Sequence, residues 1–212
     1  MKTLAYSNDI PNLLIIGQND NGKKILVQSF LYEHYGSNVN DTVINEIEIN
    51  LPSNKSITIK TKCSKMHIEI NLSIYRQYDK FIIQKIVKQL ASTNSICTTF
   101  REQGISNINN KSYRIIVIHS AEKISKKAQQ SLRKMIEMYS NSCRFILISN
   151  SVSTISDPLK SRCLLISVPS PSDSDIKKVL RFIAKQELIK YNPKLIKTII
   201  AKSDKNLRKA IL

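Results

Sequence analysis

The sequence predicts an α/β protein in which helices cover a parallel β-sheet. Three short apolar runs lie at residues 12–17, 115–118 and 143–151, and such runs are typical of strands that are buried on both faces. Amphipathic stretches of helical periodicity separate the three runs. This alternation indicates consecutive βα units.

The first unit begins with the run NLLIIG, which ends at Gly17. A short loop follows, and then a helix whose apolar residues recur at helical spacing up to Gly36, a natural helix terminus. Those apolar residues are Ile25, Leu26, Phe30 and Leu31. The order strand, glycine loop, helix is the context that a phosphate-binding loop requires.

The middle of the chain predicts extended strands and then a helix. Residues 42–75 alternate between apolar and polar around a turn signal, which favours extended strands. Residues 78–93 predict an amphipathic helix. Its apolar stripe consists of Phe81, Ile82, Ile86, Val87 and Leu90.

A loop is expected at 107–113, and the pattern of a buried strand returns at 115–118. Ser125 is a plausible cap for the helix that follows, and further strands are predicted at 143–151 and, more briefly, at 163–171. Two prolines and several small polar residues at 168–175 indicate a hinge before a helical tail. We therefore expect an α/β domain at 1–169 and part of a helical lid at 170–212.

Composition favours a polyanionic partner. Lys and Arg outnumber Asp and Glu by 33 to 16, a formal charge of +17, which suits DNA, RNA or an acidic protein surface. A basic protein without such a partner is the alternative. The four scattered cysteines (Cys63, Cys97, Cys143, Cys163) have no zinc-ligand spacing. With no secretory signal and no membrane-length apolar run, we expect an intracellular, soluble protein without a disulfide framework.

The loop after the first strand has the spacing of a phosphate-binding loop. Gly17 and Gly22 are placed to turn backbone N–H groups toward phosphates, and Lys23 is placed to reach the outer phosphates. The next position normally carries a hydroxyl that binds Mg²⁺, but here it is Lys24. Asp20 adds a negative charge within the loop. We expect nucleotide binding without the usual metal site.

The end of the second apolar run also lacks hydrolytic groups. Two carboxylates are normally found there, one for magnesium and one for water, but the chain has His119 and Ser120. Glu122 is two residues further on and is expected to be a surface charge at a helix start. Asn150, after the next strand, is a weak candidate for sensing a terminal phosphate, since an asparagine there also suits a turn. The site is therefore expected not to hydrolyse nucleotide.

Several segments together resemble the small subunits of replication factor C, the eukaryotic sliding-clamp loader of the AAA+ class. The segments are PNLLIIGQNDNGKK, AQQSLRKMIEMYSNSCRFILISNS, PLKSRCLLISVPSPS and KNLRKAIL, which occur in order from residue 11 to the end. The resemblance implies an AAA+ α/β domain followed by a helical lid. It ends within the lid, so the helical collar of the family is expected to be absent.

The resemblance also implies roles for individual residues. Arg162, in the Ser-Arg-Cys box, would act as an arginine finger on ATP held by a neighbouring subunit, and Arg208 matches a sensor arginine of the lid. Contacts with the DNA phosphate backbone are implied for basic residues at helix starts. Their candidates are Lys80, Lys126, Lys127 and, more weakly, Arg133.

The implied cofactor is ATP or ADP, with no magnesium bound in the usual way. The implied partners are the other subunits of a hetero-pentamer, the sliding clamp and primer-template DNA, in the nucleus. Two alternatives stay open. One is an active NTPase that uses Asp20 or Glu122 for its metal, and the other is a stand-alone basic DNA-binding module of the same fold.

Overall fold

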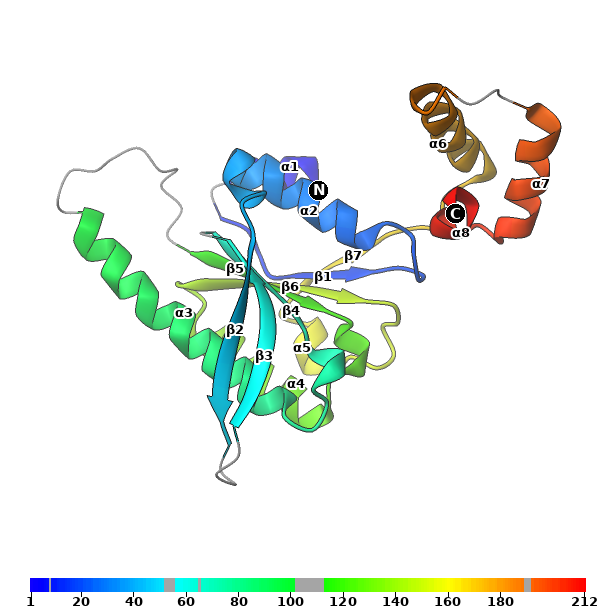
Figure 1. Cartoon of the computed structure of the whole chain (residues 1–212). Helices are drawn as coiled ribbons and strands as arrows, with labels where there is room; N and C mark the ends of the chain where they lie inside the picture. Colours follow the sequence, from blue (N-terminus) through cyan, green and yellow to red (C-terminus); the bar gives the residue numbers. More distant parts are fainter. Residues whose placement is uncertain (8, 52–55, 65, 102–112, 189–191) are drawn as a thin grey trace.

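The computed structural model describes residues 1–7, 9–51, 56–64, 66–101, 113–188 and 192–212 (Figure 1). Most of the loop expected at 107–113 lies outside the described residues. Within them, one mixed sheet has helices on both faces, and a small group of helices follows the last strand. The predicted α/β class is confirmed.

The sheet has seven strands in the order β2-β3-β4-β5-β6-β1-β7. The five strands from β4 to β7 in that order are parallel, whereas β2 and β3 form an antiparallel hairpin that continues the sheet at the β4 edge. A wholly parallel sheet was thus an incomplete prediction. The strands are β1 (Leu13–Ile16), β2 (Val43–Asn50), β3 (Ser56–Cys63), β4 (His67–Asn71), β5 (Arg114–His119), β6 (Cys143–Ser149) and β7 (Leu164–Ser167).

Helices cover the two faces of the sheet in separate sets (Figure 1). The short α1 (Lys2–Ala5) and α2 (Lys23–Tyr35) contribute to the apolar cluster on one face. The long α3 (Asp79–Arg101), α4 (Lys126–Met138) and the short α5 (Asp157–Lys160) contribute to the cluster on the other. Single 3-10 turns, η1 (Gly36–Val39), η2 (Leu72–Ile74) and η3 (Ala121–Lys123), lie between these elements.

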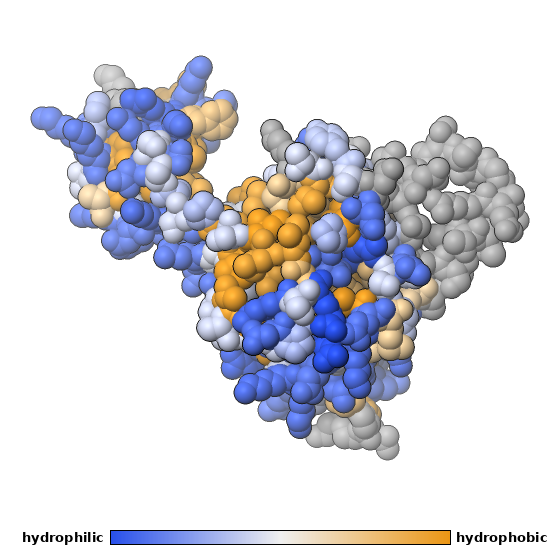
Figure 2. All heavy atoms as spheres, turned by 180° about the vertical axis from the view of Figure 1, so that it is seen from behind, coloured by the Kyte–Doolittle hydropathy of each residue, from blue (hydrophilic) through white to orange (hydrophobic). Residues whose placement is uncertain are grey.

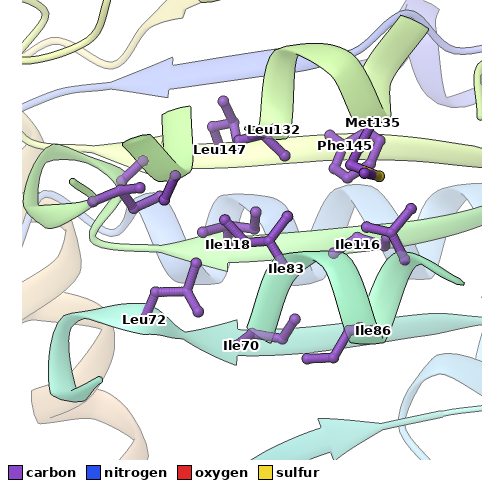
Figure 3. Packing of buried hydrophobic residues seen from close by; sticks show 14 of the residues in the cluster. Ile70, Leu72, Ile83, Ile86, Ile116, Ile118, Leu132, Met135, Phe145 and Leu147 are labelled. Atoms are coloured by element: carbon purple, nitrogen blue, oxygen red, sulfur yellow. The ribbon is translucent and has the colours of Figure 1, made fainter. Parts of the chain in front are cut away.

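Alternate side chains of the central strands point to opposite faces, so each strand supplies both clusters. In β5, Ile115 and Val117 belong to the cluster under α2, and Ile116 and Ile118 belong to the cluster under α3 and α4. Figure 3 shows the latter packing, with residues of α3 and α4 against those of β4, β5 and β6. Burial on both faces explains why these strands appear as continuous apolar runs in the sequence.

The C-terminal segment forms a small group of three helices beyond β7 (Figure 1): α6 (Asp173–Gln186), α7 (Pro193–Ser203) and α8 (Leu207–Ile211). Ser172 begins α6 with a reciprocal capping box to Asp175, which ends the proline-rich segment sharply. Ile176, Ile196 and Ala210 are the buried apolar residues of the group. Among the residues described, no helix is sufficiently long and apolar to span a bilayer.

Candidate functional site

The loop between β1 and α2 has a backbone that depends on its two glycines. A Cβ on Gly17 would lie 2.6 Å from the carbonyl oxygen of Val168, the residue after β7. That carbonyl cannot move freely, because the N–H of Val168 donates to Ile16 O at 2.6 Å and extends the sheet. Gly22 is the N-cap of α2 with φ +76°, a conformation that side chains disfavour. The loop is therefore shaped by close backbone approach and by one left-handed residue.

Lys23, the first residue of α2, folds its ammonium group over this loop. Its Nζ donates to Gly17 O at 2.8 Å and to Gln18 O at 2.5 Å, and the residue is 7% exposed. Burial lowers the pKa of Lys23, while the carboxylates of Glu122 and Asp20 act in the opposite direction. The lysine is thus held where phosphates would meet the loop, and its exposed neighbour Lys24 adds a second positive charge.

The end of β5 carries a histidine that is paired with a carboxylate from the adjacent strand. His119 Nε2 lies 3.0 Å from Glu69 Oε2, and His67 Nε2 lies 3.5 Å from Glu69 Oε1. The hydrogen bond from His119 and the proximity of His67 hold the pKa of Glu69 well below its usual range, although His67 Nε2 at 3.5 Å makes no hydrogen bond of good geometry. Ser120 has φ +54° and makes no capping bond with its side chain. A carboxylate does lie beside His119, but it is engaged with imidazole groups.

Glu122 and Asn150 form a joint pair at the same edge of the sheet. The Asn150 side-chain amide donates to Glu122 Oε1 at 2.8 Å, and its backbone N–H donates to Oε2 at 3.2 Å. Glu122 lies in the first turn of η3, as expected of a charge at a helix start, but it is half-buried and paired with Asn150. The two carboxylate oxygens of Glu122 thus each accept one N–H of Asn150. Asn150 is held near the loop by this pair.

The helical group reaches the loop through one ion pair. Arg208 Nη1 of α8 lies 2.8 Å from Asp20 Oδ1, and Asp20 has φ +60°. The hinge makes a second connection, because the Asn21 side chain donates to Ser170 Oγ at 3.3 Å and that hydroxyl donates to Gln18 Oε1 at 3.0 Å. The candidates Gly17, Gly22, Lys23, Asn150 and Arg208 thus gather around one loop.

Arg162 lies at the opposite end of the strands. The N–H of Leu164, two residues later, donates to Asn12 O before β1 begins. Leu164 is in register with Leu13, four residues before Gly17, so roughly 13 Å of strand rise separates Leu164 from Gly17, and Arg162 precedes the amino end of β7. No single side chain bridges that distance. Arg162 therefore cannot act on a nucleotide held by its own loop.

The Arg162 guanidinium is anchored on the surface. Its Nε donates to Glu137 Oε1 at 2.7 Å, its Nη2 lies 2.6 Å from the same oxygen, and its Nη1 donates to Pro158 O at 2.7 Å. Arg133, one helical turn before Glu137 in α4, approaches the same oxygen at 3.3 Å. Two candidate residues that are 29 positions apart thus meet at one carboxylate, which the sequence patterns had not indicated.

The other candidates for DNA contact cluster at the starts of α3 and α4. The buried carboxylate of Asp79 accepts from the N–H of Ser125 at 2.7 Å and from its hydroxyl at 3.0 Å. The same carboxylate accepts the N–H of Lys80 at 2.7 Å. Two helix N-termini and the exposed side chains of Lys80, Lys126 and Lys127 therefore lie together, an arrangement suited to phosphate groups. Arg133 is two turns away and belongs to the Glu137 cluster.

Neither cysteine nor metal chemistry is evident in the described part of the chain. Cys63, Cys143 and Cys163 are free thiols there, and burial raises the pKa of the last two to about 11. The Cys97 side chain lies outside the described residues. Within them, no group of three or more His, Cys, Asp or Glu side chains is arranged to hold a metal ion.

Comparisons with known proteins identify the families that the chain resembles. Residues 10–172 match the family described as DNA polymerase III, delta subunit, and residues 178–212 match the family described as RCF1/5-like, AAA+ ATPase lid domain. Replication factor C subunit 3 of Bos taurus is 35% identical over 212 residues, and that of Homo sapiens is 34% identical. The probable replication factor C subunit 3 of Dictyostelium discoideum is 36% identical over 213 residues.

The match covers the whole chain but only part of each relative. The chain spans 57% of the length of the Bos taurus and Homo sapiens proteins and 59% of the Dictyostelium discoideum protein. Two solved structures of Thermotoga maritima RuvB variants superpose with TM-scores of 0.56 and 0.57 at 13% identity, over 95% of this chain and 52% of theirs. That likeness concerns the fold alone. The chain therefore belongs to the DNA polymerase III delta-subunit family and is a homologue of the replication factor C small subunits, within the AAA+ class.

Proposed function

We propose that the chain acts as a clamp-loader small subunit that supports ATP hydrolysis on a neighbouring subunit and does not hydrolyse ATP itself. Its partners would be the other replication factor C subunits in a hetero-pentamer, the sliding clamp and primer-template DNA, in the nucleus. The observation that carries the proposal is the position of Arg162. It precedes the amino end of β7, whereas the chain's own loop follows the carboxyl end of the parallel strand β1, and 32% of its side chain is exposed.

An arginine so placed suits action in trans. In phosphoryl transfer, negative charge develops on the transferred group, and a guanidinium from another subunit stabilises it by roughly 10³-fold or more in rate. Arg162 is always charged and presents a planar fork of donors. The open edge at β7, where Leu164 and Leu165 are 44% and 53% exposed, is apolar surface that a neighbour would cover. An apolar area on the main body is also visible in Figure 2.

The chain's own loop supports nucleotide binding without hydrolysis. The Gly17 backbone and Lys23 fit the phosphates of ATP or ADP. Lys24 stands where a metal-binding hydroxyl is needed, and an ammonium group there would repel Mg²⁺. The alternative, an NTPase using Asp20 or Glu122 for the metal, is disfavoured because these carboxylates are engaged with Arg208 and Asn150.

The basic cluster supports a sequence-independent contact with DNA. Two adjoining helix N-termini carry the side chains of Lys80, Lys126 and Lys127. Ammonium groups can pair with backbone phosphates of any DNA sequence, without contacts to the bases. We propose that this cluster follows the phosphate backbone of duplex DNA. Its affinity would then fall with rising salt, and alanine at each lysine would weaken binding without changing sequence preference.

The decisive experiment is the DNA- and clamp-stimulated ATPase of a loader reconstituted with variants of this protein. Arg162→Ala should reduce kcat at least 100-fold, whereas Lys23→Ala should change it less than twofold. Lys160→Ala is the matched control, since it removes a nearby surface charge that is paired only with Asp157 among the described contacts. Full activity with Arg162→Ala would overturn the role in trans, and salt-dependent DNA binding without loader activity would favour the stand-alone DNA-binding module.

Nucleotide binding at the chain's own loop is tested separately. Fluorescent ADP should bind the purified protein with equal affinity in EDTA and in excess Mg²⁺, and Lys23→Ala should weaken binding at least tenfold. Binding that requires Mg²⁺, or steady hydrolysis abolished by Lys23→Ala, would instead establish the active NTPase.

A further inference from the structure

We propose that Glu137 is a positioning residue for Arg162, holding its guanidinium in the orientation that a neighbouring subunit's nucleotide needs. This inference rests on the proposed action of Arg162 in trans. Glu137 is the next-to-last residue of α4, and Arg162 lies just after α5. Their contact is therefore made by packing between two helices and not by closeness in the sequence.

The guanidinium is held from two sides. On one side, its Nε and Nη2 lie 2.7 and 2.6 Å from Glu137 Oε1. On the other, its Nη1 donates to Pro158 O at 2.7 Å and, more weakly, to Ser161 Oγ at 3.3 Å. A carboxylate and a main-chain carbonyl on different edges of a planar group fix both its position and its plane.

Not every donor is used by these contacts. A guanidinium has five N–H groups, and the four contacts with Glu137, Pro158 and Ser161 leave one N–H on Nη2. A phosphate oxygen of a neighbouring subunit would take this N–H and the weakly bound one on Nη1. Anchoring and presentation to a partner are thus compatible.

Anchoring matters because Arg162 is on the surface. A free, partly exposed arginine is distributed over many rotamers, and ordering it during the reaction has an entropic cost. A group that is already fixed in the free protein has lost that freedom beforehand, which is the advantage of a preorganised site. Glu137 fixes the orientation of the Arg162 guanidinium. With the hydrogen bond to Pro158 O as the main remaining contact, the guanidinium could rotate about that single hydrogen bond.

Glu137 is itself fixed by a second arginine. Arg133, four residues earlier in the same helix, lies 3.3 Å from Glu137 Oε1. Hydrogen bonds from Arg133 and Arg162 lower the pKa of Glu137, so it stays ionised throughout the neutral range. Arg133 therefore holds Glu137, and Glu137 holds Arg162. In the proposed assembly, only Arg162 would contact the neighbouring subunit.

The test compares variants in the reconstituted loader by kcat, KM and assembly. Glu137→Ala should lower kcat by roughly tenfold with KM for ATP unchanged, while Glu137→Gln, which keeps the acceptor oxygen, should restore most of that loss. Gel filtration should show normal assembly for both. Asp157→Ala is the control, because it removes another carboxylate nearby, 94% exposed and paired with Lys160, and should leave kcat within twofold.

A double variant separates positioning from a general structural effect. If Glu137 acts only through Arg162, the kcat of Glu137→Ala with Arg162→Ala should equal that of Arg162→Ala alone. Multiplying losses, or a Glu137→Ala protein with normal or raised kcat, would overturn the inference while leaving the role of Arg162 intact. An undiminished kcat in Arg162→Ala alone would instead remove the proposed function.

Discussion

Replacing Asp79 with asparagine tests whether one buried carboxylate joins α3 to α4 and thereby assembles the lysine cluster. Its two oxygens accept from Ser125 N, Ser125 Oγ and Lys80 N. An asparagine amide must direct its NH₂ group at either Ser125 N or Lys80 N, so one part-buried N–H loses its acceptor in either orientation. A hydrogen bond to a charged group contributes roughly 1.5–3 kcal/mol, and we therefore expect the free energy of unfolding to fall by about 2 kcal/mol.

Urea denaturation followed by circular dichroism measures the change in the free energy of unfolding. In a thermal scan, a loss of about 2 kcal/mol in a domain of this size should lower the melting temperature by about 4–8 °C. Duplex DNA binding at low salt should weaken as well, because the helix starts bearing Lys80 and Lys126 would no longer be tied together. Asp157→Asn, at an exposed carboxylate, should change stability by less than about 0.5 kcal/mol. A loss for Asp79→Asn no larger than this control would refute the reasoning.

Three further outcomes are expected. Gly17→Ala places a methyl group 2.6 Å from Val168 O, so the loop must shift to relieve the clash. ADP affinity measured by fluorescence should fall at least tenfold, and the free energy of unfolding should fall by about 1–3 kcal/mol. Unchanged ADP affinity would show that the loop backbone accommodates the methyl group without losing its binding conformation. Folding lowers the pKa of Glu69 from its ordinary value of 4.5. The ionised carboxylate therefore stabilises the folded protein fully at pH values above 4.5, and this stabilisation is lost progressively as the pH falls from 4.5 toward the lower pKa of the folded state. Glu69→Gln should thus destabilise the protein at pH 7, by about 2 kcal/mol in urea titrations, with a smaller difference from wild type at pH 3; an equal difference at both would contradict this. ADP affinity should be the same in wild type and in Arg162→Ala, and Lys23→Ala should lower it equally in both backgrounds, since sites far apart act additively; coupling above about 0.5 kcal/mol would show that the two sites communicate.

Local patterns predicted the strands and the loop because those elements depend on neighbouring residues. Gly17, Gly22 and Lys23 share one turn and one helix start, so their spacing alone fixes how they meet. The buried runs at β1, β5 and β6 lie at the centre of the sheet, where burial on both faces demands unbroken apolar sequence. The hairpin β2–β3 at the edge alternates and was predicted as extended.

The partners of the site residues could not be predicted in the same way. Glu69 meets His119 only because β4 and β5 are adjacent and in register, with Asn71 opposite His119. Strand order is not encoded in the pattern of any single strand, although the alternation in HIEIN does place His67 and Glu69 on one face. Glu137 meets Arg162 through packing of α4 and α5, for which the sequence carries no periodic signal.

Because the loop and Arg162 lie at opposite ends of the strands, substitutions at one of these sites need not affect the other. The loop follows the carboxyl end of β1, and Arg162 precedes the amino end of β7, its parallel neighbour. In the proposed ring, head-to-tail contacts between subunits would bring opposite faces together, so Arg162 of one subunit would serve the loop of the next. On this proposal, a subunit could carry Lys24 and His119 in place of the hydroxyl and the carboxylate of an active loop without any change at Arg162. The proposed loss of hydrolysis at the loop and the proposed action of Arg162 would therefore be independent of each other in this fold.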